Sequence, residues 1–152
     1  MGTIIEGITV TKLKIIASVP GDVMHAMKTG EPGFSGFGEA YFSTIKKGVV
    51  KGWKRHSAMT LNIVVPSGII RFVIYDDRQH SSTKNKYFEI TLSPTNYHRL
   101  TVQPGLWMAF EGIDEGLNML LNIGSIKHDP QEAENCPVES GKIKYPRIQN
   151  AF

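Results

Sequence analysis

The 152-residue chain is long enough for one domain with a hydrophobic core, and its 41% hydrophobic content is typical of globular proteins. Its 17 Lys and Arg residues against 14 Asp and Glu give a net charge of only +3, without a polybasic run, a balance that does not favour nucleic-acid binding. No apolar run approaches the roughly 20 residues that cross a bilayer, and the single cysteine, Cys136, excludes an internal disulfide and a cysteine-based metal site. We therefore expect a cytoplasmic protein that binds neither a membrane nor nucleic acid.

Short β-strands are predicted along most of the chain. Residues 3–16 alternate loosely between apolar and polar and predict one or two strands, residues 21–28 predict a short helical turn, and the Gly- and Pro-rich residues 30–38 predict a loop. Further strands, separated by turn residues, are predicted at 40–45, 49–56, 59–65, 69–75, 87–92, 98–102, 107–112 and 117–123. This succession is typical of an all-β sandwich or barrel.

One short helix is predicted near the C-terminus, beginning at Asp129. Asp129 is a favourable N-cap, Pro130 suits the first helical position, and Glu132 is placed for a capping box. We therefore expect a single domain over residues 1–152. It comprises N-terminal strands and a loop (1–37), a barrel (38–127), and the short helix with a tail (128–152).

The most informative stretch is residues 48–68, where two apolar runs flank a basic and aromatic centre. If residues 49–56 form a strand, their side chains alternate between its two faces. Lys54 and His56 then share one face, whereas Trp53 and Arg55 share the other. Two cationic or titratable groups on one face of a strand indicate either a polar pocket or a surface exposed to solvent.

The spacing in this stretch resembles the first motif of the cupin superfamily, which contains a glycine, two histidines, a glutamate and a second glycine. The matching positions are held, in order, by Gly48, Lys54, His56, Asn62 and Gly68. Residues 103–108 resemble the second motif and place Met108 at its histidine. One of four usual metal ligands is retained, and an amide and a thioether are poor replacements, so we expect no metal.

A closer resemblance is to dTDP-4-dehydrorhamnose 3,5-epimerases and related nucleotide-sugar isomerases within that superfamily. The matching segments are residues 39–62, 72–78, 104–110, 128–134 and 143–146, so the likeness covers most of the chain from Phe37 onward. It implies an all-β cupin (jelly-roll) barrel with one short C-terminal helix, a homodimer, and a pocket for a nucleotide-linked sugar inside the barrel. It implies no cofactor.

The family abstracts protons from carbons beside a ketone, which requires a base, an acid near the enolate oxygen, and groups that stabilise the developing charge. The family's base is the histidine of an R-G-L-H motif, and the corresponding residue here is Lys54. A lysine enclosed near other cations can serve as a base, or as a cation it can stabilise an enolate. His56 is either a second polar group of the site or a core histidine. The family's tyrosine acid corresponds to Asn122, and its carboxylate partner falls near Glu139.

The resemblance also assigns residues to substrate binding. Lys51 and Arg78 match positions where the family keeps Arg near the nucleotide phosphates, and Glu39 stands where it often has Gln. Trp107 either stacks on a sugar or base or is a buried core residue. The full predicted set is Glu39, Lys51, Asn62, Arg71, Arg78, Trp107 and Met108. The unassigned tyrosines that are candidates for the acid are Tyr75, Tyr97 and Tyr145.

The leading prediction is a metal-free epimerase or isomerase of a nucleotide-linked 4-keto sugar in surface-polysaccharide precursor synthesis. Its predicted catalytic residues are Lys54, His56 and Asn122. The alternative is a non-catalytic cupin that binds a nucleotide sugar or a glycan. The replaced base and acid favour the alternative, whereas the polar groups along one strand face oppose it. A metal-dependent cupin oxygenase is the third possibility.

Overall fold

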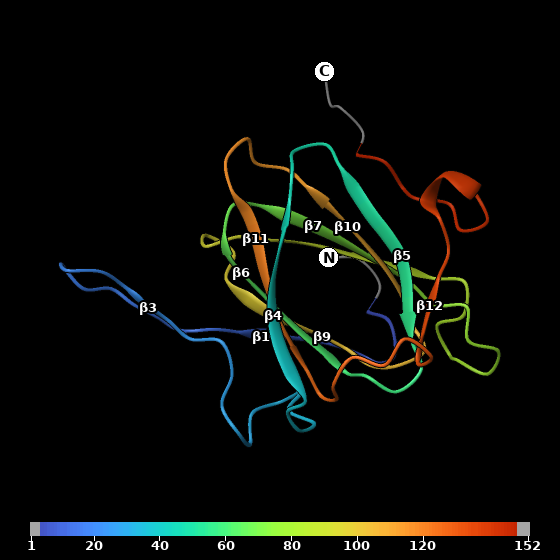
Figure 1. Cartoon of the computed structure of the whole chain (residues 1–152), viewed down its shortest axis with the longest axis horizontal. Coiled ribbons are helices and arrows are strands. Elements are labelled where there is room, and N and C mark those ends of the chain that lie inside the picture. The colour runs from blue at the N-terminus through green and yellow to red at the C-terminus, as the bar shows by residue number, and fades with distance from the viewer. Residues whose placement is uncertain (1–3, 149–152) are drawn as a thin grey trace.

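The computed structural model describes residues 4–148 of the chain. Their regular structure consists of twelve β-strands and one turn of 3-10 helix, η1 (Val138–Ser140). Ten strands form two five-stranded antiparallel sheets, and the other two form a hairpin that extends away from the body (Figure 1). The predicted all-β fold is therefore confirmed.

The first sheet has the strand order β1-β9-β6-β11-β4, and the second has the order β12-β5-β10-β7-β8. In the first sheet the strands are β1 (Ile8–Lys12), β9 (His98–Val102), β6 (Leu61–Ser67), β11 (Asn118–Gly124) and β4 (Glu39–Ile45). In the second they are β12 (Ala133–Asn135), β5 (Val50–His56), β10 (Trp107–Gly112), β7 (Ile70–Tyr75) and β8 (Tyr87–Leu92). The hairpin pairs β2 (Ile15–Ile16) with β3 (Val23–Met24). Every strand expected between residues 40 and 123 is present.

Apolar side chains at alternate positions of the strands fill the space between the two sheets. On β7, Phe72 and Ile74 are fully buried in this core, and Ile63 and Val65 of β6 reach it from the opposite sheet. Burial of such side chains is the main force that holds two amphipathic sheets face to face. The sheets remain separate around the core, in the manner of a cupin jelly roll.

The short C-terminal helix predicted from Asp129 is wrong. The segment forms a turn, in which the side chain of Asp129 accepts the N–H of Gln131 at 3.0 Å and its carbonyl accepts the N–H of Glu132 at 3.1 Å. The chain then continues as strand β12, where Ala133 pairs with His56. Glu132 turns its carboxylate inward to His56 instead of capping a helix. A tertiary partner therefore overrides the local helix signal.

The helical turn expected at residues 21–28 is also wrong, because this segment contains strand β3, which pairs with β2. Between residues 129 and 148 the chain has helical geometry only over the three residues of η1. Within residues 4–148, no helix is long and apolar enough to cross a membrane.

The C-terminal tail covers the outer face of the second sheet. Trp53 points outward there, is almost fully buried, and donates its Nε1 hydrogen to the carbonyl of Ile143 at 3.2 Å. The ring of Tyr145 packs edge-on against Trp53, with centroids 5.9 Å apart. Since neighbouring residues of a strand point to opposite faces, the outward Trp53 directs Lys54 inward.

A β-bulge in β5 changes this alternation. Lys54 lies opposite Met108 on β10, but Lys51 lies opposite Phe110, so the register shifts between them. Gly52 permits the bulge, because its φ is +148° and a Cβ there would lie 2.6 Å from the Cβ of Ala109. Simple alternation would place Lys51 on the outer face with Trp53, whereas the bulge brings it to the inner side.

Candidate active site

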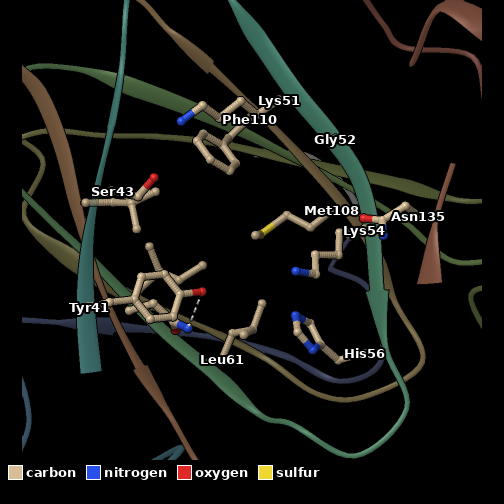
Figure 2. Close-up of a pocket in the computed structure, with 13 residues that line it drawn as sticks. Tyr41, Ser43, Lys51, Gly52, Lys54, His56, Leu61, Met108, Phe110 and Asn135 are labelled. Carbon is tan, nitrogen blue, oxygen red and sulfur yellow. Dashed lines mark hydrogen bonds between the residues drawn. The ribbon is translucent and has the colours of Figure 1, made fainter. Parts of the chain in front are cut away.

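A cavity of about 260 Å³ lies between the two sheets. The second sheet lines it through β5, β10 and β12, and the first sheet lines it through β4, β6 and β11 (Figure 2). The apolar part of the lining is Leu61, Ile63, Met108, Phe110 and Leu120. The polar side chains are Tyr41, Ser43, Lys51, Lys54, His56, Asn122 and Asn135. Lys54 and His56 project into this cavity from one face of β5 (Figure 2).

His56 is paired with the carboxylate of Glu132. The histidine is only 8% exposed, and its Nδ1 contacts Oε1 of Glu132. Oε2 of Glu132 accepts the backbone N–H groups of Ala58 at 3.1 Å and Met59 at 3.2 Å. Burial raises the pKa of Glu132, but the hydrogen bonds from His56, Ala58 and Met59 outweigh burial and hold that pKa below its ordinary value. When His56 is neutral, an ionised Glu132 holds the ring proton on Nδ1, so Nε2 is the nitrogen that can accept another proton.

Lys54 points toward the same space as His56 (Figure 2). The sequence resemblance assigned it to the position of the family base, an assignment that stays a prediction. Within the described part of the chain, its ammonium makes no hydrogen bond and no ion pair, and much of the nearby lining is apolar. A half-buried cation without an acidic partner favours a ligand that is, or becomes, negatively charged.

Tyr41 and Asn122 lie on the opposite wall, on the paired strands β4 and β11. Asn122 was predicted to correspond to the family's acid, and its Nδ2 donates to the Tyr41 hydroxyl at 3.2 Å (Figure 2). Tyr41 therefore brings a phenol to the place where a tyrosine was expected, but from the neighbouring strand. The residues suggested earlier for this role, Tyr75, Tyr97 and Tyr145, do not line the cavity.

Sequence reasoning missed both Tyr41 and Glu132. Tyr41 alternates with Ser43 on β4, which predicts a shared face, but only the register of β4 against β11 brings Tyr41 beside Asn122. Glu132 carried a helix signal that concealed its role. Glu139, where the resemblance placed the carboxylate, is exposed in η1.

Lys51 and Met108 both line the cavity. Met108 forms part of the cavity wall next to Lys54 (Figure 2). The Nζ atom of Lys51 donates to the carbonyl of Thr44 at 2.6 Å and lies 6.0 Å from the centre of the Phe110 ring. This contact links β5 to the end of β4 and holds one positive charge beside the cavity.

Three predicted binding residues do not reach the cavity, because they occupy the outer faces of the sheets. Arg71 is held by Glu89, Glu111, Tyr145 and the carbonyl of Pro146 under the C-terminal tail. Asn62 donates to the carbonyl of Gly33 at 3.0 Å and accepts from Thr101 at 2.7 Å. Trp107 donates to Asp77 at 2.9 Å and lies under the guanidinium of Arg55. Their predicted contact with the substrate is therefore not supported by this placement.

Arg78 and Glu39 also lie apart from the cavity lining. Arg78 borders a separate hollow with Arg55 and Glu134, and His56 lines both spaces. Its guanidinium is bound to the fully buried carboxylate of Asp76. Glu39 is the first residue of β4, where it pairs with Gly124, the last residue of β11.

The cupin metal positions bring a mixed set of groups to the cavity. They supply one ammonium, one imidazole and one thioether, from Lys54, His56 and Met108, while Asn62 faces away. Among residues 4–148, no group of three His, Cys, Asp or Glu side chains is placed to hold a metal ion.

No protein-family model matches the chain. A dTDP-sugar isomerase from Desulfovibrio desulfuricans has a crystal structure with a TM-score of 0.90 and 36% identity, covering 93% of this chain and 91% of that one. The RmlC 3,5-epimerase of Legionella pneumophila, solved with dTDP-4-keto-L-rhamnose, has a TM-score of 0.79 at 18% identity, over 100% of this chain and 85% of its own, which shows the shared fold.

A curated relative is a probable low-salt glycan biosynthesis epimerase of Haloferax volcanii. It is 27% identical over 96 residues, which are 62% of this chain and 62% of that protein, so the match spans less than two thirds of the relative. The isomerase from Desulfovibrio desulfuricans is matched over nearly its whole length. The chain therefore belongs to the family of this dTDP-sugar isomerase, and it shares its fold with the RmlC-type 3,5-epimerases.

Proposed function

We propose that this protein is a cytoplasmic epimerase or isomerase of a dTDP-linked 4-keto sugar, works without a metal or cofactor, and supplies a surface polysaccharide. The observation that carries the proposal is the buried His56–Glu132 pair, whose histidine lines a largely apolar cavity. The dTDP-sugar isomerase and the glycan biosynthesis epimerase among its relatives support the substrate class. The free thiol of Cys136 is in keeping with a cytoplasmic location.

The reaction begins at a carbon beside the ketone. Nε2 of His56 removes a proton from this carbon, and the electron pair of the broken C–H bond moves onto the ketone oxygen to form an enolate. The ionised Glu132 stabilises the imidazolium that results, as a carboxylate does beside a histidine base in many enzymes. Tyr41, on the other wall, donates its proton to the ketone oxygen, which gives an enol.

For inversion, a proton from water adds to the other face of the carbon, the enol hydroxyl returns its proton to Tyr41 as the ketone re-forms, and the imidazolium gives its proton to water. For a ketone shift, the imidazolium gives its proton to the former carbonyl carbon, and the hydroxyl on the deprotonated carbon gives its proton to the Tyr41 phenolate as that carbon becomes the new ketone.

Lys54 supplies charge in this assignment. The enolate is anionic in a cavity whose lining is largely apolar, where an ammonium interacts with it more strongly than in water. Lys54 therefore acts as the electrostatic partner of the enolate, although the sequence resemblance assigned it to the family's base position. We assign Lys51 to the diphosphate, because its ammonium is held beside the cavity by the carbonyl of Thr44.

The function is tested by deuterium uptake from heavy water into dTDP-4-keto-6-deoxyglucose, followed by proton NMR. We expect exchange at a carbon beside the ketone. dTDP-glucose, which has no ketone, is the matched control and should not exchange. Tight binding of the keto sugar without any exchange would support the non-catalytic sugar-binding cupin instead.

We also propose that the protein is a homodimer that involves the β2–β3 hairpin. The hairpin extends away from the sheets (Figure 1), and Ile16, Val19 and Val23 on it are 42%, 106% and 55% exposed. Apolar side chains gathered on an extended element are commonly covered by a partner, here a second copy of the chain. Light scattering should give twice the chain mass at micromolar concentration, and a monomer would contradict this.

A further inference from the structure

The proposed chemistry assigns no role to the side-chain oxygen of Asn122, Oδ1. Asn122 lies in the cavity wall, is 2% exposed, and uses its Nδ2 for the hydrogen bond to Tyr41. Its Oδ1 is buried and has no hydrogen-bond partner among the described residues. A buried amide oxygen without a donor is costly, and because Asn122 lies in the cavity wall, a ligand bound there is the available source of a donor.

The direction of the Tyr41–Asn122 hydrogen bond matters for the phenol. A tyrosine hydroxyl has one proton to give and lone pairs that accept. Because Asn122 donates to the Tyr41 oxygen, the phenol's own proton is not used by this bond. Tyr41 can then direct its proton toward the cavity, as a proton donor to an enolate must.

We propose that Asn122 positions Tyr41 as a proton donor and reads a substrate hydroxyl next to the ketone through its free Oδ1. The two polar atoms of the Asn122 amide would thereby recognise an α-hydroxy ketone. Nδ2 orients Tyr41, whose hydroxyl donates to the ketone oxygen. Oδ1 accepts a hydrogen bond from the hydroxyl on the adjacent carbon. This inference rests on the proposed function and narrows its substrate to sugars that carry both groups.

The experiment compares two probes, dTDP-4-keto-6-deoxyglucose and its 3-deoxy analogue, which lacks the hydroxyl beside the ketone. Deuterium uptake at the 5-carbon, common to both, is measured for the wild type and for Asn122→Leu. We expect the wild type to lose about 10- to 100-fold in kcat/KM on the analogue, because Oδ1 is then left unpaired. Asn122→Leu should be slower on the hydroxylated probe and should distinguish the two probes by less than about threefold.

Asn122→Asp tests the positioning of Tyr41. A carboxylate at this position accepts a hydrogen bond from the Tyr41 hydroxyl, which directs the phenol O–H away from the substrate. We therefore expect kcat to fall while KM changes little. Adding Tyr41→Phe should then cause little further loss. Asn62→Leu is the matched control, since Asn62 is an equally buried asparagine on the neighbouring strand that faces out of the cavity.

Three results would overturn the inference: equal discrimination by wild type and Asn122→Leu, an unchanged kcat in Asn122→Asp, or the same loss in Asn62→Leu. Each requires that the wild type exchanges the first probe. A wild type that exchanges neither probe would instead refute the proposed function itself. The two failures are therefore distinguishable.

Discussion

Glu132 lies in the turn before strand β12 and contacts the Nδ1 atom of His56 on β5. The same carboxylate accepts two backbone N–H groups from the segment that follows β5. The Glu132 side chain therefore connects the turn before the edge strand β12 to the cavity. It also fixes the tautomer of His56, the proposed base.

Glu132→Gln should reduce the exchange rate strongly while the protein stays folded. An amide is close in size to the carboxylate, but it cannot stabilise the imidazolium that forms when His56 takes a proton. We expect kcat to fall on the order of 10²- to 10⁴-fold, with a smaller change in KM. Steady-state kinetics with circular dichroism as a folding check will measure this. An unchanged kcat would show that the carboxylate has no part in the reaction.

The same substitution should alter the dependence of stability on pH. The folded-state pKa of Glu132 is below its ordinary value of 4.5, so its contribution to stability is present above about pH 4.5 and is lost as the pH falls through the folded pKa. Wild type should therefore lose more unfolding free energy than Glu132→Gln between pH 6 and pH 3. Urea unfolding at both pH values tests this, and parallel losses would contradict it.

Asp76→Asn should destabilise the fold at a site outside the cavity. The fully buried Asp76 carboxylate accepts hydrogen bonds from Arg78, Ser81 and Thr83, and although burial raises the pKa of this carboxyl, these bonds outweigh it and hold the pKa far below the usual range. Breaking a buried charged pair costs about 3–5 kcal/mol. Urea unfolding near neutral pH should show a loss of this order. Asp77→Asn, at a partly exposed neighbour, should cost less.

Gly52→Ala should be costly because the β5 bulge has no room for a side chain. A Cβ would lie 2.6 Å from the Cβ of Ala109 and 2.8 Å from its Cα, and the φ of +148° is strained for alanine. We expect at least about 2 kcal/mol of lost unfolding free energy. Gly48→Ala is the control, since it also has a positive φ but its Cβ meets nothing within 4 Å. Equal losses in both variants would mean that the close approach to Ala109 does not matter.

The strands were predictable because their signals are local. Alternating apolar residues bounded by Gly, Pro and polar turns depend only on neighbours in the chain, and the expected strand from 87 to 92 coincides with β8. The sharing of one face by Lys54 and His56 followed from the same alternation. The missed helix shows the limit of such signals, because Glu132 is held by a residue 76 positions away.

The site was only partly predictable because it depends on register and on which side of a sheet is covered. Arg71 and Trp107 lie on β7 and β10, as expected, but on the outer face beneath the tail or the Arg55 side chain. Lys51 reaches the inner side only through a bulge that alternation does not reveal. Tyr41 and Asn122 meet through cross-strand pairing, which a single sequence does not encode in any short motif.

The most direct test of the account compares deuterium uptake into dTDP-4-keto-6-deoxyglucose by His56→Asn and Lys54→Met. If His56 is the base, His56→Asn should reduce exchange to the uncatalysed background, whereas Lys54→Met should be slowed but remain measurable, because it removes only the stabilising charge. Both variants should still bind dTDP. Exchange that survives in His56→Asn and disappears in Lys54→Met would contradict the account and make Lys54 the base.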